Sequence, residues 1–141
     1  MDLDRIFFKT DLFEIEEGED AETNPNIYGK QFANWLKSNF TDLGYEVEEI
    51  IPEDWGWCVM CERSPEMLWV GCASFIDGDV EEGQLPDKKD VIWHCFATSE
   101  RPILKRIFSK ASGQSKLEKL KKELEKMIHE EESFNIVQEP I

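Results

Sequence analysis

The clearest pattern in this chain is a run of apolar residues spaced as on one face of an α-helix. It consists of Tyr28, Phe32, Trp35, Leu36, Phe40 and Leu43. These spacings of three, four, seven and eight place all six side chains on one face, with polar residues opposite. Gly44 follows the last of them and is a common residue just past a helix C-terminus. The pattern predicts an amphipathic helix over residues 28–43.

Period-two patterns predict strands in the first two thirds of the chain. Strands are expected within residues 6–16 and at residues 45–48, 55–62, 67–76 and 91–98. The near-continuous apolar run at 67–76 is typical of a central strand that is covered on both faces. The acidic stretches 16–26 and 77–90 contain glycine and proline, and we expect them to be exposed loops.

Alternation within two of these strands predicts which side chains share a face. Trp55, Trp57, Val59 and Cys61 would point one way, and Gly56, Cys58, Met60 and Glu62 the other. In the last strand, the face would consist of Val91, Trp93, Cys95 and Ala97.

Helical patterns return at the C-terminal end. A short helix is expected over residues 102–108, since Pro102 suits a first helical turn. Residues 111–115 contain Gly113 and are interpreted as a break before a last helix at 115–131. The apolar stripe of that helix is Leu117, Leu120, Leu124, Met127 and Ile128. Residues 134–137 could add an edge strand.

The order of these elements predicts an α+β fold. It reads β-α-β-β-β-β-α-α, with a possible C-terminal edge strand, and the short links between strands favour antiparallel pairing. We expect a mainly antiparallel sheet of about four to six strands with helices packed on one face. With 141 residues, the chain is expected to form a single domain over residues 1–141.

Charge limits the classes of partner. The chain has 31 acidic and 16 basic residues and a formal net charge of −15. Such a charge disfavours nucleic acids and anionic membranes, and it fits either a basic protein partner or solubility alone. The sequence shows no apolar run near the roughly 20 residues that span a bilayer and no basic, apolar leader, so we expect a cytoplasmic protein without direct nucleic-acid or membrane binding.

Cysteine and histidine chemistry finds little support. Cys58 and Cys61 are three residues apart in an expected strand, so they should face opposite ways, whereas a zinc knuckle turns both thiolates toward one metal. Cys95 and His94 are neighbours and should also face apart, although His94 could lie opposite Cys72 or Cys58 on an adjacent strand. We therefore predict no catalytic residue, no metal site and no cofactor.

The segment Pro52-Glu53-Asp54-Trp55-Gly56-Trp57 is the best candidate for an interaction site. Five carboxylates gather just before its first tryptophan: Glu46, Glu48, Glu49, Glu53 and Asp54. Two interpretations stay open. The tryptophans could form the core of the sheet against the helix at 28–43, or Trp55 could lie at a sheet end as an aromatic anchor ringed by acids.

Several segments together resemble a family of small uncharacterised bacterial proteins. They are Tyr28-Gly29-Lys30-Gln31-Phe32-Ala33-Asn34-Trp35-Leu36, Gly44-Tyr45, the 52–57 segment and Arg101-Pro102-Ile103-Leu104-Lys105-Arg106-Ile107-Phe108. The resemblance covers most of the chain and implies no established activity. In size and acidity the chain is also similar to immunity proteins that neutralise secreted bacterial toxins.

These observations predict a non-enzymatic interaction protein. The leading hypothesis is an immunity-type inhibitor that covers the cationic active site of a basic toxin or nuclease with Glu46, Glu48, Glu49, Glu53 and Asp54, with Trp55 as the apolar anchor. A second hypothesis is a phage- or plasmid-type anti-defence protein that mimics nucleic-acid charge. A third is a small-ligand or sugar-binding domain or a carboxylate-based enzyme, which requires a concave apolar pocket with an inward carboxylate.

Overall fold

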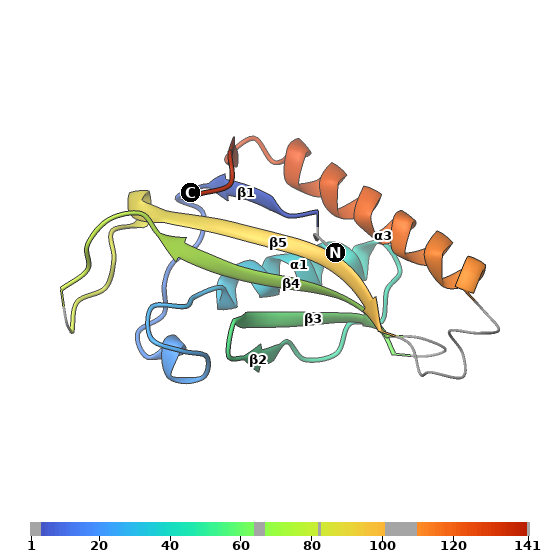
Figure 1. Ribbon diagram of the computed structural model, residues 1–141, viewed down its shortest axis with the longest axis horizontal. Coiled ribbons are helices and arrows are strands. Elements are labelled where there is room, and N and C mark those ends of the chain that lie inside the picture. The colour runs from blue at the N-terminus through green and yellow to red at the C-terminus, as the bar shows by residue number, and fades with distance from the viewer. Residues whose placement is uncertain (1–3, 64–66, 82, 101–109, 141) are drawn as a thin grey trace.

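The computed structural model describes residues 4–63, 67–81, 83–100 and 110–140. It contains one six-stranded antiparallel sheet in the order β2-β3-β4-β5-β1-β6, two α-helices and two short 3-10 turns (Figure 1). The strands are β1 (Ile6–Lys9), β2 (Ile51–Glu53), β3 (Gly56–Glu62), β4 (Met67–Ile76), β5 (Val91–Glu100) and β6 (Asn135–Val137). The helices are α1 (Lys30–Asp42) and α3 (Lys110–Glu130), and the 3-10 turns are η1 (Glu19–Ala21) and η2 (Lys88–Asp90).

Both described helices pack on one face of the sheet, which we call the inner face. In Figure 1, α1 lies behind β3 and β4, and α3 lies beside β1 and β5. The buried faces of the helices, represented by Phe32 and Leu36 of α1 and Leu120 and Leu124 of α3, belong to one continuous core. The predicted α+β class is therefore confirmed, with helices on one face of an antiparallel sheet.

The core follows from alternation along the strands. Trp57, Val59, Val70 and Trp93 all point to the inner face and are no more than 2 % exposed. Burying an aliphatic or aromatic side chain of this kind stabilises the fold by about 1.5–3 kcal/mol. The predicted strand faces of β3 and β5 are confirmed for these residues, and residues 134–137 do add an edge strand, β6.

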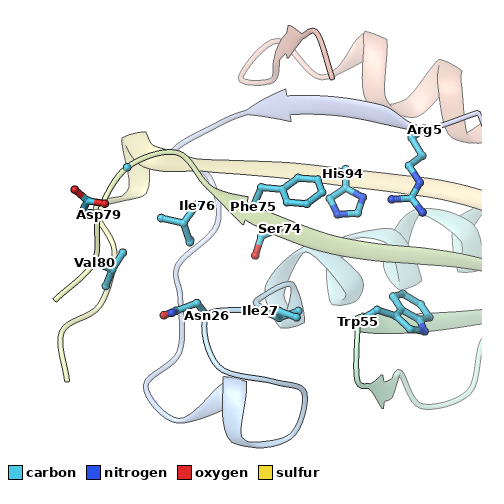
Figure 2. Close-up of a pocket in the computed structure, with 11 residues that line it drawn as sticks. Arg5, Asn26, Ile27, Trp55, Ser74, Phe75, Ile76, Asp79, Val80 and His94 are labelled. Atoms are coloured by element: carbon cyan, nitrogen blue, oxygen red, sulfur yellow. The ribbon is translucent and has the colours of Figure 1, made fainter. Parts of the chain in front are cut away.

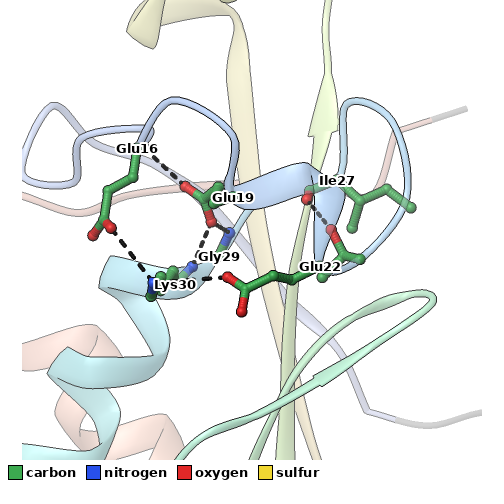
Figure 3. A network of polar contacts seen from close by, with 7 residues as sticks. Glu16, Glu19, Glu22, Ile27, Gly29 and Lys30 are labelled. Carbon is green, nitrogen blue, oxygen red and sulfur yellow. Dashed lines mark hydrogen bonds and ion pairs between the residues drawn. The ribbon is translucent and has the colours of Figure 1, made fainter.

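The first turn of α1 is capped by a carboxylate from outside the helix. Gly29 precedes the helix with φ near +153°, and it has no side chain that could accept the free N–H groups of the first turn. Glu19 accepts these bonds instead, from the N–H of Gly29 at 3.2 Å and of Lys30 at 3.0 Å. Its other oxygen accepts the N–H of Glu16 at 3.0 Å (Figure 3).

Glu19 corrects the prediction that residues 16–26 form an exposed acidic loop. Its side chain is only 3 % exposed, although Glu17 and Glu22 nearby are exposed. Burial raises the pKa of Glu19, and its three backbone donors partly oppose that shift. One of the acidic residues of the chain is therefore structural, because it satisfies donors that a helix N-terminus leaves without partners.

Two other predictions for the elements are wrong, and a third falls outside the described residues. Residues 45–48 form no strand. The strand begins at Ile51 instead and contains Pro52, which an edge strand tolerates because its outer side needs no N–H donor. The break expected at residues 111–115 is helical, since α3 begins at Lys110. The short helix expected at residues 102–108 lies outside the described residues.

β4 lies in the middle of the sheet, but it is not covered on both faces as its apolar run predicted. The two described helices cover only its inner face. The outward residue Phe75 is 42 % exposed. The apolar residues on the other side of β4 therefore belong to a face that is partly open to solvent.

We predict that Glu19→Gln lowers the free energy of unfolding by about 1–3 kcal/mol, because the amide has one acceptor oxygen for donors that approach from two sides. Urea denaturation measures the change. The matched control is Glu22→Gln, which removes only an exposed ion pair with Lys30 at 3.7 Å and should cost at most about 0.5 kcal/mol. Equal effects of the two substitutions would contradict the capping role.

Candidate functional site on the outer face of the sheet

The outer face of the sheet, opposite the two described helices, carries large side chains, most of them aromatic, that take no part in the inner core. Alternation brings its side chains from four strands. They are Phe7 of β1, Met60 of β3, Trp69 and Phe75 of β4, and His94 and Phe96 of β5. Trp55, in the turn between β2 and β3, joins them.

Gly56 sets the position of Trp55. Asp54 and Trp55 form the two-residue turn of a hairpin in which Glu53 pairs with Gly56. The backbone of Gly56 has φ near +152°, and a Cβ atom there would lie 2.4 Å from the carbonyl oxygen of Cys72. Only glycine fits so close to the backbone of β4. The regular alternation of side chains along β3 begins after the turn.

The prediction that Trp55 and Trp57 share a face is therefore wrong. Trp57 lies in the inner core and is 2 % exposed, whereas Trp55 stacks on the outer face and is 37 % exposed. The alternation expected over residues 55–62 holds from Gly56 to Cys61. It fails at Trp55, which belongs to the turn and not to the strand, and at Glu62, where the register shifts and Glu62 pairs with the inward Leu68. Of the two interpretations left open for Trp55, the core position is excluded.

Trp55 is held in place by other rings. Its ring stacks on Trp69 with centroids 5.6 Å apart and lies 5.8 Å from Phe96. Trp69 and Phe96 meet edge to face at 5.7 Å. Gly71 provides the floor, because a Cβ atom there would lie 2.5 Å from the Phe96 ring and 2.9 Å from Trp55. We call Trp55, Trp69 and Phe96 the aromatic triad.

A second group of rings continues the outer face toward β1. The imidazole of His94 is stacked against Phe75 at 4.7 Å and against Phe7 at 5.5 Å. His94 pairs with Ala73 on β4 and with Phe7 on β1. The hypothesis that His94 lies opposite Cys72 or Cys58 is therefore wrong.

Two cavities lie along this face and share three lining residues. The larger has a volume of about 530 Å³ and runs from Asn26 and Asp79 past Phe75 (Figure 2). The smaller, of about 370 Å³, lies over the aromatic triad and Thr98. Arg5, Trp55 and His94 line both cavities, so these three residues mark the place where the two meet.

Arg5 is the cation of this site. Its guanidinium carbon lies 5.1 Å from the centroid of the Phe96 ring, a favourable cation–π geometry. No carboxylate in the described part of the chain forms an ion pair with it, and its side chain is exposed. Lys9, at the end of β1, pairs with Asp77 at 3.5 Å.

His94 is neutral in this surrounding. It is 5 % exposed, and burial together with the nearby Arg5 charge lowers its pKa to about 4. Its Nδ1 atom is buried and has no hydrogen-bond partner within the described residues. At pH 7 the three residues that both cavities share therefore supply one guanidinium, one uncharged imidazole and one indole ring.

The five acidic residues predicted as a site are exposed, but they do not all meet Trp55. Glu53 ends β2 and Asp54 begins the turn, so both adjoin Trp55 along the chain. Glu46 and Glu48 line a separate polar depression with Tyr45 and Arg63, where Glu48 pairs with Arg63 at 3.4 Å. Glu49 is exposed in the loop before β2.

The four cysteines are buried, and none is positioned as a nucleophile. Cys61 belongs to the inner core, whereas Cys58 pairs with Gly71 of the outer face, as the strand parity predicted. Burial raises the pKa of Cys58 to about 11 and that of Cys61 to about 12. No three His, Cys, Asp or Glu side chains among the described residues are grouped so that they could hold a metal ion.

Comparisons with protein-family models, with curated proteins and with solved structures find no match to this chain. The resemblance to a family of small bacterial proteins therefore stays a prediction. None of the helices that the structure describes is long and apolar enough to cross a membrane.

Sequence reasoning missed Arg5, Phe75, His94 and Phe96 as members of a site. The signal was present in the strand parity, because the outward positions of both central strands also carry large or ring-containing side chains. In the sequence alone, this signal is the same as that of a strand covered on both faces. Arg5 could not be found in this way, since it lies just before β1, where no pattern assigns a direction.

The low pKa of His94 makes stability dependent on pH. The unfolded chain takes up a proton near pH 6.5 and the folded chain only near pH 4, so stability falls as the pH drops through this window. Between pH 7 and pH 5 the loss attributable to His94 is about 2 kcal/mol. We expect His94→Phe to remove this part of the decrease, as measured by urea denaturation at both pH values. An unchanged decrease in the variant would contradict the buried, neutral imidazole.

Proposed function

We propose that this chain is a non-enzymatic interaction domain that binds a basic protein through the outer face of its sheet, with Trp55 as the anchor. One observation supports the proposal above the others. Trp55 is 37 % exposed, is held by stacking on Trp69, and directly follows Glu53 and Asp54. A large, partly exposed aromatic side chain beside two carboxylates is typical of a hot spot that binds a basic partner.

The packing of Trp55 favours binding in a second way. A side chain that is already immobilised loses little rotamer freedom when a partner covers it, and each mobile side chain would cost about 0.5–1.5 kcal/mol. The glycine floor at position 71 and the stack on Trp69 fix the ring before any partner arrives. The net charge of −15 would accelerate the encounter with a cationic surface.

The more specific proposal is an immunity-type inhibitor that neutralises a basic toxin or nuclease by covering its active site. Glu53 and Asp54 would pair with cationic groups next to Trp55. Glu46, Glu48 and Glu49 lie on the loop that precedes β2 and would extend the acidic contact along this edge of the sheet. Glu48 would exchange its exposed partner Arg63 for a basic group of the toxin.

A second function has an observation of its own. Two cavities of about 530 and 370 Å³ have volumes within the range of small-ligand sites, about 300–1,000 Å³. The residues that they share include Arg5 and His94 and no carboxylate. Asp79 lines the larger cavity but not the smaller one. The second proposal is therefore a ligand-binding domain, because the residues common to both cavities supply a cation and no carboxylate.

The nucleic-acid mimic receives less support. It requires carboxylates in a regular stripe that copies phosphate spacing. Several exposed acids are instead interleaved with lysines on separate elements, as in the pairs Lys9–Asp77 and Lys126–Glu130.

The protein-interaction proposal is tested by capturing the partner from the native host and then measuring its affinity for variants. Glu53→Lys with Asp54→Lys, and separately Trp55→Ala, should each weaken binding at least tenfold, because they remove charge pairing and the anchor. Binding to the wild-type chain should also weaken as the salt concentration rises.

The matched control is Glu125→Lys with Glu132→Lys, which changes the net charge equally at exposed positions on and after α3. It should leave the dissociation rate unchanged and slow association only modestly. Equal losses with both charge reversals, or an affinity that salt does not change, would overturn the proposal.

A further inference from the structure

Arg5 combines the lack of an acidic partner with a position at both cavities. Lys37, Lys119 and Lys122 also form no ion pair within the described residues, but they line neither cavity. Acidic residues outnumber basic ones by 31 to 16, and other cations such as Lys30, Lys88 and Lys121 each have a carboxylate in contact. Arg5 has none within the described residues, although its side chain is exposed. A cation left unpaired in so acidic a protein is available to an external anion.

The geometry also prepares Arg5 for such a contact. The Phe96 ring, 5.1 Å from the guanidinium carbon, occupies one face of the group. A planar guanidinium that is held on its face keeps its N–H edges free, and these edges match the two oxygens of a carboxylate. Because Arg5 lines both cavities, an anion bound there would lie where the two meet.

His94 gives an independent indication. Its side chain is 5 % exposed and lines the same junction, and its Nδ1 atom has no partner within the described residues. Buried polar atoms are normally satisfied, and one without a partner calls for an explanation such as a ligand or a water molecule. The neutral imidazole adds a polar group to the junction without adding a second charge.

Apart from Thr98, the rest of the smaller cavity is aromatic. Trp55, Trp69 and Phe96 line it. The rings of Trp55 and Trp69 stack on each other, and both side chains are partly exposed. Flat apolar rings stack well on such a surface. A cationic ligand would also be attracted to these rings, but the charge of Arg5 would repel it.

We propose that the junction of the two cavities binds a small aromatic carboxylate, whose carboxylate pairs with Arg5 and whose ring packs on the aromatic triad. The proposal goes beyond the interaction function, since it requires no protein partner and does not involve Glu53 or Asp54. Because Trp55 belongs to both surfaces, the bound acid would compete with a protein partner.

The test uses the full chain and three probes: 2-naphthoate, the neutral 2-naphthamide, and acetate. Binding is followed by NMR through the indole N–H signals of the tryptophans. We expect 2-naphthoate to shift the signals of Trp55 and Trp69 and to bind at least fivefold more tightly than 2-naphthamide. Acetate should bind much more weakly than 2-naphthoate, because it lacks the ring.

Arg5→Gln should remove the preference for 2-naphthoate over 2-naphthamide. The matched control Lys9→Gln removes the same charge from β1 outside both cavities and should keep the preference. Circular dichroism verifies that both variants are folded. We expect them to fold, because neither Arg5 nor Lys9 is buried.

Three results would overturn the proposal. Equal affinity for naphthoate and naphthamide would show that the carboxylate is not recognised, and equal shifts with acetate would show that the rings take no part. If Arg5→Gln weakened binding of the captured protein partner while 2-naphthoate did not bind, the occupant of the junction would be a carboxylate of that partner. The separate effect of Glu53→Lys with Asp54→Lys on the protein partner distinguishes failure of this site from failure of the interaction proposal.

Discussion

At Gly56 the chain passes so close to β4 that a side chain there would overlap the backbone. A Cβ atom would lie 2.4 Å from the carbonyl oxygen of Cys72 and 2.7 Å from Cβ of Ala73. The positive φ that goes with this approach separates two tryptophans that are two residues apart in the sequence. Trp57 completes the core against α1, and Trp55 turns to the outer face. The inner core and the candidate site both depend on this one glycine.

The second constraint is that the described helices cover only one face of a sheet whose central strands are apolar on both. The outer face limits its contact with water mainly by packing rings on rings. Phe96, at 6 % exposure, is covered in part by Trp55, Trp69 and Arg5, and Phe7 by Phe75 and His94. The outermost members, Trp55 and Phe75, are left partly exposed. A face built in this way suits contact with another molecule, whether a protein or a small aromatic acid.

The sequence predicted the architecture well because period-two and helical patterns report directly on which side of an element is buried. The α+β class, the 67–76 strand and the inner faces of β3 and β5 follow from that signal. The pattern fails at the turn that holds Trp55, because the local backbone geometry breaks the period of two. It also fails where contacts between residues far apart in the sequence decide the role of a side chain. No pattern near Glu19 in the sequence predicts that its side chain caps a helix that begins eleven residues later.

For the candidate site, the sequence directs attention to the segment with Glu53, Asp54 and Trp55 but not to its surroundings. The structure shows that Trp55 lies on an accessible surface. The strand order brings Arg5 and His94 beside it through the pairing of β1 with β5, and a single sequence does not contain that pairing. The site therefore changed from an acidic segment to an aromatic face with one cation at its centre and acids at its edge.

The opposite orientation of Trp55 and Trp57 is the central claim, and ¹⁹F NMR of the chain labelled with 5-fluorotryptophan tests it most directly. Single Trp→Phe variants assign the signals, and the shift between H₂O and D₂O reports contact with solvent. The structure predicts a clear solvent shift for Trp55 and none for Trp57 or Trp93. A protected Trp55, or a Trp57 that responds to solvent, would contradict the account.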